Sequence, residues 1–235
     1  AKKDSNASND SNASNDSNAS NASNDSNLNL YNPRPKTIVF EGFTNNDETP
    51  FRPNLTPSQV LRAGAFGGTY FRKITSGVTG KTYSYKEAIK EYPKSWFKGL
   101  DIEKQIARPY NEYDINANKY KKKVGLTLKQ WETNKWITAT DPYGWFQWYC
   151  RFYMGRRLGD EDLYQIGRFN GMSRFIGSLV TTIKKKENIT KKSHWNDPSV
   201  GTGYRQTLLH WGYQLTLKDY NRFKSDKKDK GYKIR

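Results

Sequence analysis

The side chains best suited to chemistry in this sequence are arginines that lie outside the apolar faces of the expected helices. Six positions meet this description: Arg151, Arg156, Arg157, Arg168, Arg174 and Arg205. A guanidinium donates forked hydrogen bonds to phosphate or carboxylate groups, so these residues are candidate anion-binding groups. They share one surface if the helices lie side by side, which periodicity within a helix does not decide. In the alternative interpretation they form ion pairs with Asp141 and with the acidic residues 160–162.

A run of lysines adds to the candidate anion-binding surface. Residues 119–123 read KYKKK, with one aromatic side chain among four cations. Such a run is typical of a segment that contacts the backbone of a nucleic acid, and Lys121, Lys122 and Lys123 are the candidate contacts. A solvated loop explains the same composition, and the sequence leaves both interpretations open.

Groups for covalent or acid–base catalysis are few. The one thiol, Cys150, could act with His194 or His210, but it lies in the middle of an expected helix among aromatic residues. A reactive thiolate usually lies near a helix N-terminus or a cation, so we interpret Cys150 as a buried cysteine. One cysteine and two histidines do not favour a tetrahedral zinc site. We therefore assign no catalytic residue, metal or cofactor, and leave open whether the protein is an enzyme.

The charge distribution indicates an anionic partner. The chain of 235 residues has a net charge of +17. Residues 1–32 contribute −2, residues 33–140 contribute +9 (19 basic, 10 acidic) and residues 141–235 contribute +10 (19 basic, 9 acidic). Positive charge spread over the whole expected domain attracts polyanions over a long range, although net charge also serves solubility.

The composition separates a tail from a folded region. Residues 1–27 consist almost wholly of Ser, Asn, Ala and Asp, and such a segment has no apolar surface to bury. We expect a disordered tail over residues 1–32, a basic helical domain over residues 33–220 and a basic C-terminal tail over residues 221–235. A single cysteine excludes an intrachain disulfide. No apolar run predicts a membrane helix, and we expect an intracellular protein of the cytoplasm or nucleus.

Local signals in the N-terminal half predict a small β element and capped helices. Residues 37–43 read TIVFEGF, typical of a short strand, and residues 45–53 are expected to be a loop. Helix-capping patterns occur at residues 56–59, 84–87 and 127–130. The glycine pair at 67–68 favours a tight turn over a phosphate cradle, because the surrounding pattern is not that of a P-loop. Residues 69–72 are expected to pair with residues 82–85 in a hairpin.

An aromatic helix is expected to begin at Asp141, as the cap, and Pro142, as the first helical residue. Its apolar face is formed by aromatic residues: Trp145, Trp148, Tyr149 and Phe152. Helical periodicity places Gln147 and Arg151 on the opposite side.

The apolar pattern after this helix changes phase at residues 170–171, an Asn-Gly pair that tolerates left-handed backbone. Two helices are therefore expected, over residues 160–169 and 172–186. The acidic residues 160–162 begin the first of them, where the helix dipole favours negative charge. A last helix is expected over residues 204–217.

Four sequence blocks resemble a widespread family of uncharacterised proteins. The blocks are FGGTYFR (66–72), DPYGWFQWYCRFYMGRR (141–157), QIGRF (165–169) and RQTLLHW (205–211). The resemblance covers about residues 55–217, and the second block is its most distinctive part. It implies that the low-complexity tail is an addition to the domain, and it implies no particular activity, cofactor or partner.

We expect a single, mainly α, aromatic-rich helical domain with a small β-hairpin element. The leading functional prediction is sequence-nonspecific binding of nucleic acid or another polyanion through an arginine-rich surface. An enzyme that acts on an anionic substrate bound by the same arginines is one alternative, and a protein-interaction or structural module is another. A deep pocket at the arginines favours the enzyme, and a flat basic face favours binding.

Overall fold

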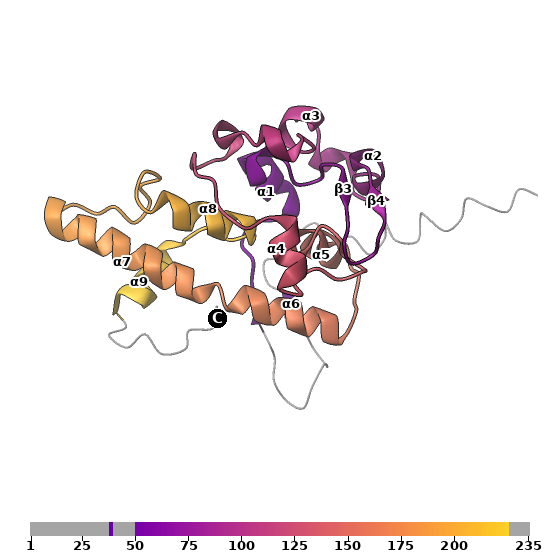
Figure 1. Ribbon diagram of the computed structural model, residues 1–235. Helices are drawn as coiled ribbons and strands as arrows, with labels where there is room; N and C mark the ends of the chain where they lie inside the picture. Colours follow the sequence, from indigo (N-terminus) through magenta and orange to yellow (C-terminus); the bar gives the residue numbers. More distant parts are fainter. Residues whose placement is uncertain (1–37, 40–49, 226–235) are drawn as a thin grey trace, which may run out of the picture.

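The structure is a computed structural model that describes residues 38–39 and 50–225 (Figure 1). The described chain is mainly helical, as predicted. Its α-helices are α1 Pro57–Ala63, α2 Tyr85–Ala88, α3 Ile102–Gln105, α4 Leu128–Thr133, α5 Trp145–Tyr153, α6 Asp160–Asn170, α7 Ser173–Thr190, α8 Thr202–His210 and α9 Leu217–Ser225. Its 3₁₀ helices are η2 Phe66–Gly68, η3 Lys94–Trp96, η4 Tyr110–Glu112 and η5 Ile115–Ala117, and its strands are β1 Ile38–Val39, β2 Pro50–Phe51, β3 Ile74–Thr75 and β4 Thr82–Tyr83. The predicted tail over residues 1–32 lies outside the described residues.

The strands form two antiparallel pairs, β1 with β2 and β3 with β4. The predicted hairpin is present, but the partner of β4 is β3 and not residues 69–72. Those residues form a turn in which the N–H of Arg72 donates to the carbonyl of Thr69, at 3.3 Å. This bond occupies backbone groups that a strand ladder would need. The expected loop over residues 45–53 was also wrong in part, because it contains β2.

The predicted helix starts at residues 56, 84 and 127 are confirmed. The hydroxyl oxygen of Thr56 accepts the backbone N–H of Gln59, and the Gln59 side chain accepts the N–H of Thr56 in return. Thr127 and Gln130 form the same reciprocal pair at the start of α4. These bonds satisfy N–H groups that the first turn of a helix leaves without a partner, so a local motif is sufficient to begin each helix.

Helix α5 begins at Trp145 with Gly144 as its cap, and not at Pro142 with Asp141 as its cap. The Asp141 carboxylate accepts hydrogen bonds from arginine side chains beyond the middle of α5 and is therefore not directed at the first turn. The glycine has a φ of 84°, a conformation that L side chains rarely adopt, and it turns the chain into the helix.

Helix α5 is buried on nearly all sides, whereas its sequence predicts a polar face. Gln147, expected on that face, is 2 % exposed, and its Oε1 accepts the N–H of Tyr143 at 2.9 Å. The phenol of Tyr70 also accepts the N–H of Gln147, at 2.7 Å. Neighbouring segments thus cover the polar side and satisfy its hydrogen-bonding groups.

Phe51 of β2 is the centre of the aromatic core. Its ring meets five other rings edge to face, with centroid separations from 4.9 to 6.4 Å. These rings belong to Trp145, Trp148, Tyr149, Phe152 and Phe169. A two-residue strand therefore joins α5 to α6 through one fully buried side chain.

Helices α6 and α7 follow one another along one side of the molecule, with the predicted break between them (Figure 1). The break does not use the expected left-handed backbone, because Gly171 has a φ of −62°. Helix α7 packs against both α8 and α9. Helix α8 ends at His210, earlier than the predicted residue 217, and Gly212 has a φ of 66°. The carbonyl of Gly212 accepts the N–H groups of Asn54 and Leu55, which ties this bend to the chain before α1. Helix α9 runs across the predicted domain boundary at residue 220 and buries Tyr220 and Phe223.

Candidate functional site

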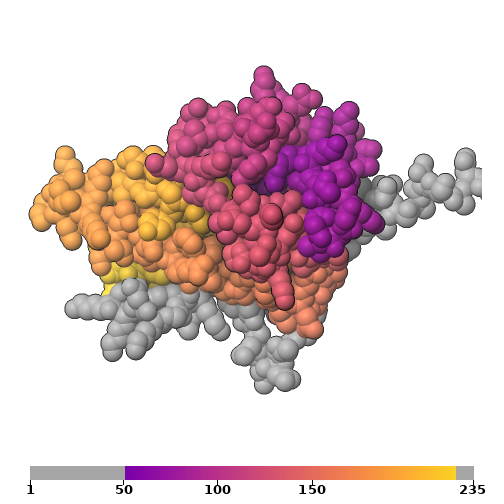
Figure 2. Space-filling view, viewed as in Figure 1, coloured from indigo at the N-terminus to yellow at the C-terminus, as the bar shows by residue number. Residues whose placement is uncertain are grey.

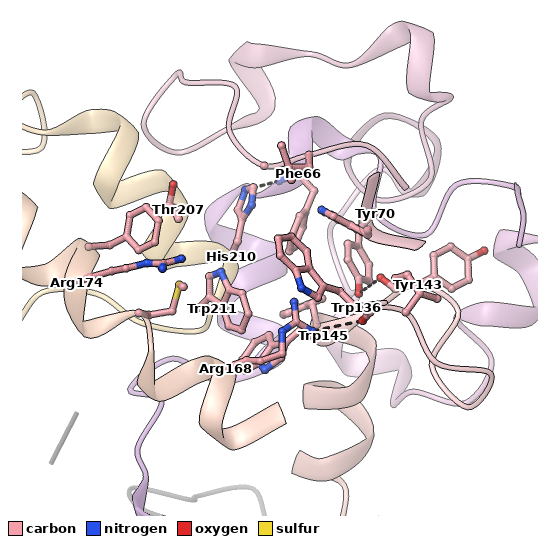
Figure 3. Close-up of a pocket in the computed structure, with 18 residues that line it drawn as sticks. Phe66, Tyr70, Trp136, Tyr143, Trp145, Arg168, Arg174, Thr207, His210 and Trp211 are labelled. Atoms are coloured by element: carbon pink, nitrogen blue, oxygen red, sulfur yellow. Dashed lines mark hydrogen bonds between the residues drawn. The ribbon is translucent and has the colours of Figure 1, made fainter. Parts of the chain in front are cut away.

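A cavity of about 340 Å³ lies where α4, α5, α6, α7 and α8 meet the turn of η2 (Figure 3). Its volume is within the range of about 300–1,000 Å³ that is usual for ligand pockets. Aromatic side chains form most of its wall, and four of them are indoles: Trp131, Trp136, Trp145 and Trp211. Figure 2 shows this face of the molecule, where the segment that holds α4 lies between the β3–β4 hairpin and α7. We call this cavity the aromatic pocket.

The walls of the aromatic pocket present flat ring faces. Trp145 and Trp211 have ring centroids 4.4 Å apart, and the rings of Phe66 and His210 are stacked at 4.1 Å. Trp211 is only half-buried and lines the cavity. Such walls suit a planar ligand, since aromatic rings stack favourably on one another.

Arg168 of α6 lies in the pocket wall and is held by rings. Its guanidinium carbon lies 5.3 Å from the ring centre of Trp136 and 5.4 Å from that of Trp211. Its Nη1 donates to Oε1 of Gln165, at 3.0 Å. Burial lowers the pKa of Arg168 from its ordinary value, and no carboxylate of the described chain lies within ion-pair distance. The guanidinium still stays charged at neutral pH.

Arg174 of α7 reaches the same pocket from its open side. The residue is exposed, and its guanidinium lies 5.0 Å from the ring centre of Phe175. In Figure 3 the indole of Trp211 lies between the guanidiniums of Arg168 and Arg174. Among the described residues, Arg174 also has no carboxylate at ion-pair distance. Two cations therefore flank an aromatic cavity with unused hydrogen-bonding capacity for an anion.

The other predicted arginines do not line the aromatic pocket. Arg151 and Arg156 both form ion pairs with Asp141, and Arg151 also pairs with Glu91 at 2.9 Å. Arg157 lies over the ring of Phe152, 3.8 Å from its centre, and donates to the carbonyl of the same residue.

Arg205 is 6 % exposed and donates to the carbonyls of Val200 and Trp195, at 2.8 and 2.7 Å. It therefore fastens the loop between α7 and α8 from inside the protein. Of the predicted six, the structure thus brings Arg168 and Arg174 together at the aromatic pocket, and Arg151 and Arg156 together at Asp141.

Of the three predicted lysines, Lys123 lines a second, smaller cavity, and Lys121 and Lys122 line neither that cavity nor the aromatic pocket. The Nζ of Lys123 lies 4.8 Å from the ring centre of Tyr113. Lys121 has a φ of 52°, and its ammonium donates to the carbonyl of Asn116. Lys122 is exposed.

His210 is a wall of the aromatic pocket that the sequence did not single out for binding. The N–H of Phe66 donates to its Nε2 at 3.2 Å, so the proton of the neutral ring is on Nδ1. Burial lowers the pKa of His210 from its ordinary value of 6.5 to about 3. The imidazole is therefore neutral at pH 7, and it lines the aromatic pocket as an uncharged aromatic ring.

We expect this histidine to make the folded state sensitive to mild acid. The unfolded chain binds a proton at His210 near pH 6.5 and the folded chain near pH 3, so stability rises with pH between those values. The expected loss is about 1.4 kcal/mol per pH unit below 6.5, or about 2 kcal/mol by pH 5. Urea unfolding at pH 5–7.5 measures it.

A His210→Gln variant removes the titrating group and should flatten this profile above pH 5. Hydrogen bonds from neighbouring groups lower the pKa values of the Glu187 and Asp197 carboxylates to about 2. These two groups therefore change the stability of the protein only at lower pH. An unchanged slope in the variant would assign the acid sensitivity to another group.

The described lining of the aromatic pocket contains no carboxylate and no thiol. Cys150 is 0 % exposed within the core, and burial raises its pKa, which makes its thiolate scarce at neutral pH. Asp162 is also fully buried and accepts the indole N–H of Trp148 at 2.7 Å. No group of three His, Cys, Asp or Glu side chains in the described chain is arranged to hold a metal ion. The arrangement suits binding of a planar anion.

The four sequence blocks meet at the aromatic pocket, although up to 145 positions separate their lining residues. Phe66 and Tyr70 come from the first block, Trp145 and Phe146 from the second, and Arg168 from the third. The last block supplies its own lining residues: Thr207, His210 and Trp211. Fold and site together define a helical domain with an aromatic pocket flanked by two arginines. No protein-family model, curated protein or solved structure matches the chain.

Proposed function

We propose that this domain binds single-stranded nucleic acid, without reading its sequence, through the aromatic pocket. One base stacks on the rings of the pocket, and its phosphate is held by the guanidiniums of Arg168 and Arg174. One observation carries the proposal: two arginines that lack carboxylate partners in the described chain lie in the wall of a cavity made of aromatic rings.

Single-stranded nucleic acid fits this site better than a duplex. Bases in a duplex are covered by their neighbours, whereas an unpaired base exposes both ring faces. Stacking of a base on an aromatic side chain contributes roughly 1–3 kcal/mol and depends little on the identity of the base. A pocket of this kind therefore gives affinity without sequence readout.

The charge of the chain supports a polyanion over a neutral planar ligand. Basic side chains exceed acidic ones both before and after residue 140. This field attracts a phosphate backbone from a distance, and the described lining of the aromatic pocket contains no acidic residue to repel it. We expect a protein that binds such a ligand to act in the cytoplasm or nucleus.

The same pocket would also orient an anionic substrate for an enzyme. We favour binding because the described lining offers a neutral histidine and hydroxyl groups, but no carboxylate or thiol that could act with them. The resemblance to a family that shares the four blocks remains a prediction. If it holds, the blocks mark a binding pocket common to that family.

We expect Arg174→Gln to weaken binding of a short oligothymidylate by about tenfold, because a charged hydrogen-bond donor to phosphate is lost. Quenching of tryptophan fluorescence measures the affinity directly, since four indoles line the site. The dependence of log K on log salt should become shallower by about 0.7 for the one lost phosphate contact. Arg168→Gln should show the same change from the inner side of the pocket.

The matched control is Arg52→Gln, which removes the same charge at an exposed position outside the aromatic pocket. It should leave the affinity nearly unchanged. Equal losses in Arg52→Gln and Arg174→Gln would show that binding is diffuse. Failure of the oligonucleotide to bind at low salt would contradict the proposal.

A further inference from the structure

The smaller cavity adjoins the aromatic pocket and shares part of its wall. Both are lined by Phe66, Tyr70, Trp131 and His210. The smaller cavity has a volume of about 50 Å³, and its remaining wall includes two cations and two phenols: Arg72, Lys123, Tyr110 and Tyr113. We call it the side cavity.

The two cations of the side cavity are held by rings, as Arg168 is in the aromatic pocket. The guanidinium of Arg72 lies 5.2 Å from the ring centre of Tyr110 and donates to the carbonyl of Thr69 at 3.0 Å. The ammonium of Lys123 lies 5.6 Å from the same ring of Tyr110 and 4.8 Å from that of Tyr113. The described lining contains no carboxylate. The positive charge of the side cavity is therefore available to an anion.

The size of the side cavity restricts what it can hold. Its volume of about 50 Å³ is far below the 340 Å³ of the aromatic pocket, so it is better matched to a compact group than to a base. A phosphoryl group is compact, carries negative charge and accepts several hydrogen bonds. Charge and volume thus select the same kind of occupant.

We propose that the side cavity is a second phosphate subsite. A nucleotide with its base in the aromatic pocket then binds through the phosphates on both its 5′ and its 3′ side. One phosphate meets Arg168 and Arg174, and the other meets Arg72 and Lys123. This inference rests on the proposed function and narrows it. The favoured ligand is an internal nucleotide of a strand, or a nucleoside 3′,5′-bisphosphate, and not a nucleoside 5′-monophosphate.

The shared wall explains how one ligand reaches both cavities. Phe66 stacks on His210 at the boundary, and its backbone N–H is used by the same imidazole. The ring of Phe66 is 9 % exposed, so the boundary is a built wall rather than a loose loop. A sugar between two phosphates is the part of a nucleotide that would pass along it.

The test compares adenosine 5′-monophosphate with adenosine 3′,5′-bisphosphate by calorimetric titration of the full chain. The bisphosphate is expected to bind about tenfold more tightly than the monophosphate, because it adds a charged contact. In Lys123→Gln this advantage should fall to about threefold or less. Lys123 is exposed, so its replacement is not expected to disturb folding.

Lys122→Gln is the matched control, because Lys122 is an exposed neighbour that does not line either cavity. Arg72→Gln is the second test variant and should also remove the advantage of the bisphosphate. Equal affinities of the two nucleotides in the wild-type chain would overturn the second subsite but not the first. Equal losses in Lys122→Gln and Lys123→Gln would also overturn it. Failure of both nucleotides to bind, together with the oligothymidylate, would overturn the proposed function itself.

Discussion

Replacing Asp141 with asparagine is expected to lower the free energy of unfolding by about 3–5 kcal/mol, because a buried ion pair loses one of its charges. Asp141 is 0 % exposed. Its two carboxylate oxygens each accept from a different guanidinium, Oδ1 from Arg151 and Oδ2 from Arg156. Asparagine has the same shape, but its amide group would face an arginine donor with donors of its own. Denaturant unfolding, monitored by tryptophan fluorescence, measures the change.

The control for this prediction is Glu91→Gln. Glu91 is the other carboxylate partner of Arg151, and its side chain is 33 % exposed. Water can replace it, so the expected cost is below about 1 kcal/mol. Similar costs for the two variants would mean that burial of Asp141 does not determine the strength of this network. We expect nucleotide binding to survive in whatever fraction of the Asp141 variant remains folded, because Asp141 does not line the aromatic pocket.

Replacing Gly68 with alanine is expected to destabilise the protein by about 2–5 kcal/mol, as the sum of two separate costs. Gly68 has a φ of +75°, which costs an L residue about 1–2 kcal/mol. An added Cβ would also lie 2.3 Å from the carbonyl oxygen of Lys104, a backbone atom that cannot rotate away. Overpacking of this kind adds about 1–3 kcal/mol. Thermal and denaturant unfolding both report the effect.

Gly80→Ala separates the two contributions to this cost. Gly80 has a similar φ of +68°, but a Cβ added there would have no atom of the described chain within 4 Å. Gly80→Ala should therefore lower the free energy of unfolding only by the cost of the backbone conformation, about 1–2 kcal/mol. If Gly68→Ala is no worse than Gly80→Ala, the turn relaxes and does not hold Phe66 in place.

The turn at Gly68 also decides between two interpretations of the glycine pair. The N–H of Gly67 donates to Oδ1 of Asn118 at 2.8 Å, and the N–H of Gly68 donates to the carbonyl of Ala65 at 3.4 Å. These donors are already used within the protein, so they do not cradle a phosphate. The favoured interpretation, a tight turn, is confirmed. Its role is to present the ring of Phe66 to both cavities.

Features that depend on neighbours in sequence could be predicted from the sequence. The caps at Thr56, Ser84 and Thr127 and the break between α6 and α7 involve groups within about four residues of one another. Local hydrogen bonds decide the caps, and the change of phase in the apolar pattern marks the break, so both can be read from short stretches of sequence.

Features that depend on distant partners could not be predicted in this way. Phe51 belongs to an expected loop, yet five rings from α5 and α6 make it a core residue. Asp141 is a residue type that often caps helices, but its carboxylate forms ion pairs with two arginines beyond the first turn of α5. In each case the competing partner is invisible to a local pattern.

The arginines show the same limit at the candidate site. Periodicity gives the direction of a side chain from its own helix, but it does not give the element that lies there. Arg205 and Arg168 are both off the apolar stripe of their helices. Arg205 donates to backbone carbonyls in the interior, whereas Arg168 lies over the rings of Trp136 and Trp211.

A basic, mainly helical, aromatic-rich chain with capped helices follows from composition and short-range pattern alone. The sequence alone does not identify the two arginines that line the aromatic pocket. That pocket is assembled from residues between Phe66 and Trp211, which come together only when the helices pack. Helix α7 packs against α8 and follows directly on α6, which places Arg168 and Arg174 among rings and leaves the carboxylates elsewhere. That difference in surroundings, and not the residue type, separates a candidate ligand-binding arginine from a structural one.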